Sequence, residues 1–174
     1  IALDANALLS LPGALNIYDI DEDKNRLSSA IIKLTNEALG ALIEMRCREG
    51  QALQSDLRLR INRIARIEKL IKMHFRKALN RRLKKLRTPE EKSSFIKNSD
   101  ITEELVRINY HIRNFNRLLN KSDTYGKELD FIAQEIQRET NTTGAKSIDA
   151  FVSSGVVKMK SEIEKIREQL QNVE

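Results

Sequence analysis

The chain has 174 residues, of which 40% are hydrophobic and 32% are charged, and its formal net charge is +6. Its single cysteine, Cys47, excludes an internal disulfide and a zinc site built from several thiolates. Because prolines, glycines and aromatic residues are scarce, the composition favours helices over sheets around a buried core. No apolar run reaches the length of a membrane span. We therefore expect no membrane segment and a reducing, cytoplasmic location, and we take the start at Ile1 as that of a fragment or processed form.

The first half of the chain predicts two long helices. A helical period of apolar residues starts after Asp21 or Asp23, and this helix is expected to end or bend near Gly50. A second period continues to about residue 87, a length of roughly 55 Å if helical. The two helices are expected to pack as a long hairpin over residues 21–87. The apolar positions are Leu27, Ile31, Leu34, Ala38, Leu42 and Met45 in the first helix, and Leu53, Leu57, Ile61, Ile64, Ile67, Ile71, Phe75, Leu79, Leu83 and Leu86 in the second.

The positive charge is concentrated in residues 51–87. This segment holds 13 Lys and Arg against Asp56 and Glu68, so its net charge is +11, whereas the remainder of the chain carries −5. A ridge of this kind is suited to the phosphates of RNA, although a solvated helix face is the usual reading of a charge run. Phe75 is the only aromatic in the segment and lies on the apolar stripe, so base stacking is not expected there.

The second half predicts a compact set of shorter helices. Thr88, Pro89 and Glu91 form a helix start with a capping box. Further helices are expected from Asp100 to residue 119, over 124–142 before a turn at Thr143-Gly144, and over the last twenty residues. Their apolar positions are Ile101, Leu105, Ile108, Ile112, Phe115 and Leu119 in the first, Leu129, Ile132 and Ile136 in the second, and Val156, Met159, Ile163, Ile166, Leu170 and Val173 in the last. The fold class is therefore all-α, with a long helical hairpin followed by a compact helical C-terminal domain, divided into residues 1–88 and 89–174.

Two polar clusters are candidates for chemistry. Glu104, Arg107 and His111 share one face of their helix, where a carboxylate and an imidazole can bind a divalent metal or act as acid and base. Glu135 and Glu139 lie one turn apart and can chelate a metal together with a ligand from a facing helix. The alternatives are a Glu103–Arg107 salt bridge, a structural histidine, and acidic side chains paired with Arg138 or Lys146.

Five ordered blocks of the chain resemble the YicC/YloC family of bacterial proteins. The blocks are Leu11-Pro12-Gly13, Arg48 to Leu53, Asp100 to Arg107 with His111, Gly126 to Lys146, and Glu164 to Glu174, the last resembling the natural C-terminus. The resemblance also implies that an N-terminal domain is missing here.

Membership of this family implies a metal-dependent endoribonuclease that acts in RNA turnover with Mn²⁺ or Mg²⁺, as a homo-oligomer, in particular a hexamer. By this resemblance the catalytic candidates are His111, Glu104, Glu135 and Glu139. The metal candidates are these four and Asp130. The RNA contacts are expected at Arg107, Arg138, Lys146, Arg63, Arg66, Arg81, Arg82, Lys84 and Lys85. Two alternatives stay open: a non-catalytic RNA-binding adaptor, and a structural helical oligomer.

Overall fold

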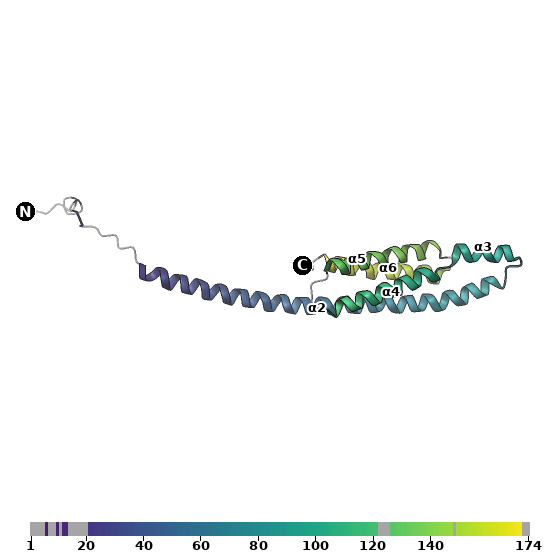
Figure 1. Cartoon of the computed structure of the whole chain (residues 1–174), viewed down its shortest axis with the longest axis horizontal. Coiled ribbons are helices and arrows are strands. Elements are labelled where there is room, and N and C mark those ends of the chain that lie inside the picture. Colours follow the sequence, from purple (N-terminus) through teal and green to yellow (C-terminus); the bar gives the residue numbers. More distant parts are fainter. Residues whose placement is uncertain are drawn as a thin grey trace, which may run out of the picture. The chain divides into compact units, whose positions relative to one another are not determined.

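The part of the chain that the structure describes is almost entirely helical. This computed structural model describes residues 6, 10, 12–13, 21–121, 126–147 and 149–171, with the side chains of 21–23 left aside. Within these residues there is no strand, and the prediction of an all-α fold is confirmed. The predictions that concern Val173 and Glu174 lie outside the described residues. The helices are α2 (Asp21–Leu83), α3 (Pro89–Ser99), α4 (Thr102–Leu119), α5 (Gly126–Ala145) and α6 (Ala150–Leu170) (Figure 1).

The chain divides into two compact units, residues 1–48 and 49–174, which we describe separately. The predicted helix end near Gly50 is wrong, and so is the predicted hairpin, because residues 21–83 form the single helix α2. A glycine inside a helix costs only about 1 kcal/mol relative to alanine, and no proline or cap accompanies it. The predicted boundary after residue 88 stays a prediction.

The first unit contains a helix with an exposed apolar stripe. The predicted period is present, but its large side chains Leu27, Ile31, Leu34, Leu42 and Met45 are 45–64% exposed. A helix of this kind gains most of its stability in a protein from packing this face against a partner. The described residues of this unit supply no such partner.

The second unit is an antiparallel four-helix bundle formed by residues 49–83 of α2 with α4, α5 and α6. Each helix turns one apolar stripe inward, and the predicted stripes supply most of the core. The buried members are Leu57, Ile61, Ile64, Ile71 and Phe75 of α2, Leu105, Ile108, Ile112, Phe115, Leu118 and Leu119 of α4, Leu129, Ala133 and Ile136 of α5, and Val152, Val156, Met159, Ile163, Ile166 and Leu170 of α6, together with Ile101.

Polar contacts between neighbouring helices fix the order α2, α4, α5, α6 around this core. The amide of Gln54 donates to the Leu119 carbonyl at 2.5 Å, next to the end of α4. The other neighbours are joined by Arg107–Glu139, Asp130–Arg167 and Arg63–Glu162, at 3.2–3.4 Å.

Local capping accounts for where the shorter helices begin. The hydroxyl of Thr88 accepts from the backbone N–H of Glu91, whose carboxylate accepts from the N–H of Thr88, so the predicted capping box is confirmed. The carboxylate of Asp100 accepts from the N–H of Thr102, the first residue of α4. At α6, Asp149 is the N-cap and accepts from the N–H of Phe151 at 2.8 Å.

The predicted turn at Thr143-Gly144 is wrong, because both residues lie within α5. A side chain at Gly144 would come within 3.1 Å of Val156 in α6. This glycine therefore serves close approach of two helices rather than a change in backbone direction. Gly155 of α6 has the same role against α2, since a Cβ there would lie 2.8 Å from Cδ1 of the fully buried Ile71.

Replacing Gly155 by valine is expected to lower the free energy of unfolding of the bundle by about 1–3 kcal/mol, because the added carbons overpack the α2–α6 interface. The matched control is Gly50→Ala, where nothing lies within 4 Å and the helix gains about 0.5–1 kcal/mol. Urea unfolding followed by circular dichroism measures both changes. Equal effects of the two substitutions would contradict the close packing at Gly155.

Candidate functional site at the α4–α5 interface

Two buried carboxylates lie in the interface between α4 and α5. Glu104, in the first turn of α4, is only 6% exposed, and Glu139 of α5 is 4% exposed. Buried carboxylates require cations or hydrogen-bond donors to remain charged. Lys146, which directly follows α5, places its Nζ 2.6 Å from Oε1 of Glu104. Its ammonium also donates to the backbone carbonyl of Asp100 at 3.4 Å.

Arg107 serves the second carboxylate. Its guanidinium lies 3.3 Å from Oε1 of Glu139 and also pairs with Glu103, one turn earlier on α4. The hydrogen bond to Glu139, followed by the charge of Glu103, raises the pKa of Arg107 above its ordinary value. The hydrogen bond to Glu104 likewise raises the pKa of Lys146. Both cations are therefore held in their charged forms.

The same helix register brings His111 and Glu135 to one level of the interface. His111 is one turn beyond Arg107 on α4, and Glu135 is one turn before Glu139 on the antiparallel α5. His111 is half-buried and contacts the ring of Tyr110 edge-on, with 5.3 Å between centroids. Within the described residues it forms no hydrogen bond, so neither ring nitrogen is engaged. Arg138 lies 3.8 Å from Glu135, as the alternative reading of this acidic pair expected.

Asp130 does not join this cluster. It precedes Glu139 by nine residues, about two and a half helical turns, and so lies on the opposite side of α5. There its carboxylate accepts from Arg167 of α6 at 3.2 Å and from Gln134 at 2.7 Å. The structure thus brings together Glu104, Arg107, Glu139 and Lys146, places His111 and Glu135 beside them, and separates Asp130.

The expected metal finds only part of a ligand set here. Oε2 of Glu104 is buried without a hydrogen-bond partner, which suits a cation. However, the other oxygen of Glu104 and the carboxylate of Glu139 already hold Lys146 and Arg107. Across residues 21–121, 126–147 and 149–171, no three His, Cys, Asp or Glu side chains come together as a metal site. The described residues of one chain therefore do not complete a metal site.

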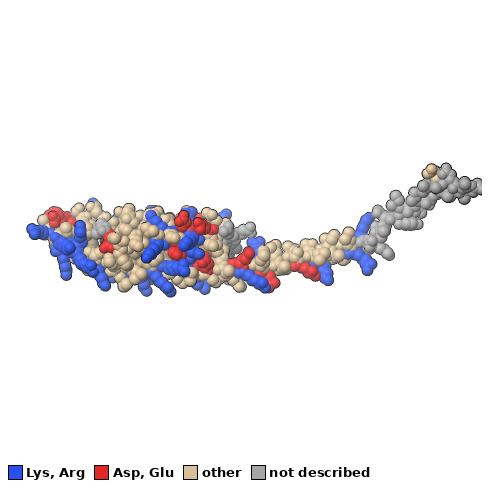
Figure 2. Space-filling model, turned by 180° about the vertical axis from the view of Figure 1, so that it is seen from behind, with Lys and Arg blue, Asp and Glu red and all other residues tan. Residues whose placement is uncertain are grey.

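The basic surface lies at the end of α2 and in the residues that follow it. Seven exposed Lys and Arg side chains occur between residues 76 and 87, and none of them pairs with an acidic side chain of the described chain. Figure 2 shows the blue side chains gathered at this end of the bundle and along its lower edge. They include four of the predicted RNA contacts. The seven are Arg76, Lys77, Arg81, Arg82, Lys84, Lys85 and Arg87.

Other predicted residues of α2 have structural partners. Arg63 lies 3.4 Å from Glu162 of α6 and, with Arg66 and Lys158, borders a cavity of about 340 Å³. His74 pairs with Asp149 at 3.2 Å and stacks on Phe151. Burial alone would raise the pKa of Asp149, but its bonds from the Phe151 N–H and from His74 outweigh this and lower it.

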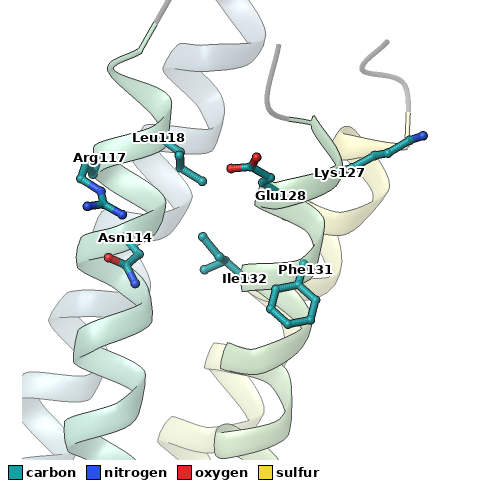
Figure 3. A pocket seen from close by; sticks show the side chains of 7 residues that line it. All are labelled: Asn114, Arg117, Leu118, Lys127, Glu128, Phe131 and Ile132. Atoms are coloured by element: carbon teal, nitrogen blue, oxygen red, sulfur yellow. The ribbon is translucent and has the colours of Figure 1, made fainter. Parts of the chain in front are cut away.

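Two features of the bundle were missed from the sequence. Glu68, counted there only as an acid within the basic segment, is buried, and burial raises the pKa of its carboxyl despite the nearby Lys72 and a hydrogen bond with Asn109. The second is a cavity between α4 and α5, one to two turns beyond His111 (Figure 3). Only the helix pairing reveals either one, because each depends on which residues face each other.

Comparison with known proteins identifies the family. Residues 58–174, which include the whole α4–α5 interface, match "Endoribonuclease YicC-like, C-terminal". The chain belongs to the YicC-like endoribonuclease family. Residues 1–55 match "Endoribonuclease YicC-like, N-terminal region", so at least part of that region is present in this chain.

Two curated relatives of this YicC-like chain are both named "Probable endoribonuclease YicC". The protein of Clostridioides difficile is 38% identical over 94% of this chain and 61% of its own length. The protein of Haemophilus influenzae is 30% identical over 96% of this chain and 62% of its own length. The chain thus spans about three fifths of each relative. No described helix is long and apolar enough to cross a membrane.

Replacing Lys146 by methionine is expected to lower the free energy of unfolding by about 1–3 kcal/mol, because it leaves the Glu104 charge buried without a cation. The expected decrease is smaller than that for breaking a fully buried ion pair, because about a third of the Lys146 side chain is exposed. The Glu104→Leu/Lys146→Met double variant is expected to regain most of the loss. Urea unfolding of the single and double variants measures the coupling.

The pH dependence of the same pair has a definite sign. Since the pKa of Lys146 is raised in the folded state, the stabilisation is fully present below the ordinary lysine value of 10.5. It is lost as the pH rises through the higher folded-state pKa. The stability of the unmodified chain relative to that of the double variant should therefore be constant from pH 7 to 9 and fall above pH 10.5. A constant difference up to pH 12 would contradict the ion pair.

Proposed function

We propose that this chain forms part of an endoribonuclease that cleaves RNA phosphodiester bonds at the α4–α5 interface. The observation that carries the proposal is the match of residues 58–174 to the C-terminal part of an endoribonuclease family, since those residues build the whole interface. The names of the two relatives point to the same activity. We place the protein in the cytoplasm, in RNA turnover.

RNA is held first by the basic end of α2. Seven exposed cations there, free of acidic partners among the described residues, bind phosphates and release counterions. The α4–α5 interface is less basic: Glu103, Glu104 and Glu139 outnumber Arg107 and Lys146. Attraction of the RNA and cleavage of its backbone are therefore tasks of different helices.

The cleavage chemistry is an attack by the RNA's own 2′-hydroxyl. His111, whose ring nitrogens have no partner in the described chain, takes the hydroxyl proton as a general base. The 2′-oxygen bonds to the adjacent phosphorus, and the bond from phosphorus to the 5′-oxygen breaks. The leaving oxygen takes a proton from water, and the proton held by His111 neutralises the hydroxide so formed, which yields a 2′,3′-cyclic phosphate and a 5′-hydroxyl. Arg107, Arg138 and Lys146 supply positive charge to the transition state.

Glu104, Glu135 and Glu139 have supporting tasks in this proposal. Glu104 positions Lys146, and Glu139 positions Arg107. Both carboxylates also keep these two side chains in their charged forms. Glu135, at the level of His111, supplies a negative charge that stabilises the protonated imidazole. These three carboxylates, with His111, are also where Mn²⁺ or Mg²⁺ would bind, and the metal would supply Lewis-acid polarisation of the phosphate. Further ligands would come from outside the described residues of one chain.

Self-association is the second part of the proposal. The exposed stripe of residues 27–45 is apolar enough to require a partner, and a second copy of the chain presents the same stripe. We propose a homo-oligomer, in particular a hexamer. A non-catalytic RNA-binding adaptor is the alternative, favoured by the concentration of basic charge on a helix that carries none of the acid–base candidates.

Replacing His111 by alanine is expected to lower the rate of RNA cleavage by about 10²–10⁴-fold, because it removes the proposed general base, while RNA affinity is unchanged. Cleavage of a structured RNA is measured by gel, and the 2′,3′-cyclic ends are identified by mass spectrometry. The control is Lys165→Ala, an exposed side chain of α6. Parallel reactions with Mn²⁺ and with chelator test metal dependence.

Each outcome of that experiment is informative. Cleavage that is lost in the His111 variant and kept in the control supports the nuclease proposal. Full activity of the His111 variant would move the base elsewhere. RNA binding by the unmodified protein without cleavage under either metal condition would favour the adaptor.

The basic end of α2 predicts a salt-dependent affinity. For single-stranded RNA, the plot of log affinity against log salt loses a slope of about 0.7 for each phosphate contact removed. Arg81→Gln/Arg82→Gln should therefore flatten the slope by about 1.4, as measured by fluorescence anisotropy. The control is Lys160→Gln/Lys165→Gln on α6, which removes equal charge. Equal slopes for the two variants would show that net charge, and not the α2 end, governs binding.

A further inference from the structure

The cavity between α4 and α5 has the composition of a binding site. It has a volume of about 350 Å³ and is lined by residues of both helices. In Figure 3, Leu118 and Ile132 point toward each other between the two ribbons and give the cavity an apolar interior. The remaining lining residues are Asn114 and Arg117 of α4, and Lys127, Glu128 and Phe131 of α5.

Phe131 is the unusual member of this lining. Its side chain is 63% exposed, although a phenylalanine gains stability by leaving water. A single exposed apolar residue needs no explanation in general. Whether the exposure of Phe131 has a function is therefore judged from the residues around it. Three aromatic side chains are exposed in the described chain, and the rings of Tyr110 and Phe151 contact His111 and His74. Phe131 has no ring partner in the described chain and borders the cavity.

The polar residues around the cavity are available for a ligand. Asn114 presents an amide that both donates and accepts, and Glu128 presents an acceptor. Neither forms a hydrogen bond or ion pair with another described side chain, and Arg117 has no acidic partner there. Figure 3 shows the Glu128 carboxylate directed toward α4. An acceptor in this position disfavours a bare phosphate and suits a ligand with polar edges and a flat apolar face.

We propose that this cavity binds one unpaired RNA base, and this inference rests on the proposed nuclease function. The base stacks on the ring of Phe131, its edge bonds to Asn114 and Glu128, and Arg117 contacts the phosphate of the same nucleotide. Paired bases in an RNA helix are not open to such contacts, so the substrate is single-stranded or has an unpaired nucleotide at this point. Because Glu128 accepts hydrogen bonds, bases that carry an amino group fit better than uracil.

The position of the cavity ties it to the proposed chemistry. Phe131 is one turn before Glu135 on α5, and Asn114 is about one turn beyond His111 on α4. A base held here therefore places the neighbouring phosphodiester toward His111. In this proposal, the cavity selects an unpaired nucleotide next to the cleaved bond. The phosphate contacts on α2 cannot make this selection, because phosphates carry no information about the base.

The test uses the absence of tryptophan from this chain. Phe131→Trp introduces a single tryptophan beside the cavity, and a stacked base quenches its fluorescence. Single-stranded RNA is titrated into this variant of the 174-residue chain, followed by an abasic strand of the same length and charge. Val157→Trp, at an α6 position that is 66% exposed, is the matched control. Binding of labelled RNA is recorded in parallel by fluorescence anisotropy.

Quenching of the Phe131→Trp variant by RNA, but not by the abasic strand and not in the control, is the expected result. Phe131→Leu should weaken RNA binding by about 5- to 150-fold, with rescue by Phe131→Tyr. RNA that binds without quenching, or equal quenching by the abasic strand, would overturn the base site and leave the nuclease proposal intact. Failure of the unmodified chain to bind RNA would overturn both.

Discussion

The burial of Glu104 and Glu139 between α4 and α5 is the constraint on which the candidate site depends. Neither carboxylate tolerates burial without a cation, and the two cations come from opposite helices. Lys146 reaches Glu104 from the end of α5, and Arg107 reaches Glu139 from α4. These crossed pairs fix the register of the two helices, because a shift by one residue would leave two charges buried and unpaired. The levels of His111 and of the cavity beyond it follow from that register.

Two different electrostatic roles, long-range attraction and short-range positioning, fall on different helices. The end of α2 carries cations alone, which suits long-range attraction of a polyanion. The α4–α5 interface carries paired charges of both signs, which suits short-range positioning of groups around a reacting bond. A site as basic as α2 would bind any phosphate in many positions. Paired side chains with fixed directions restrict where a phosphodiester can lie.

The sequence predicted the core of the bundle far better than the pairing of its polar residues. Apolar periodicity identified nearly every inward position of α2, α4, α5 and α6, because each helix buries one face in a shared core. The same reasoning failed at Gly50 and Gly144, since glycine is tolerated inside a helix and also permits close helix contact. It named Glu104, Arg107, Glu139 and Lys146 as candidates, but the pairs span 42 and 32 residues and depend on tertiary packing. Phe131 was missed because apolar periodicity predicts only which positions face the core. It does not indicate that an outward-facing ring lies beside a cavity.

The expected metal site and the expected oligomer both require side chains from beyond the described residues of one chain. In one chain, Glu104 offers a single unpartnered oxygen, because its other oxygen holds Lys146, and the carboxylate of Glu139 holds Arg107. A divalent ion needs several oxygen or nitrogen ligands, so metal binding at this interface requires side chains from beyond the described residues of one chain. The exposed apolar stripe of residues 27–45 has the same requirement for a partner. If copies of the chain meet through that stripe, the assembly is what decides whether a complete ligand set forms, and metal dependence then becomes a property of the oligomer rather than of the single chain.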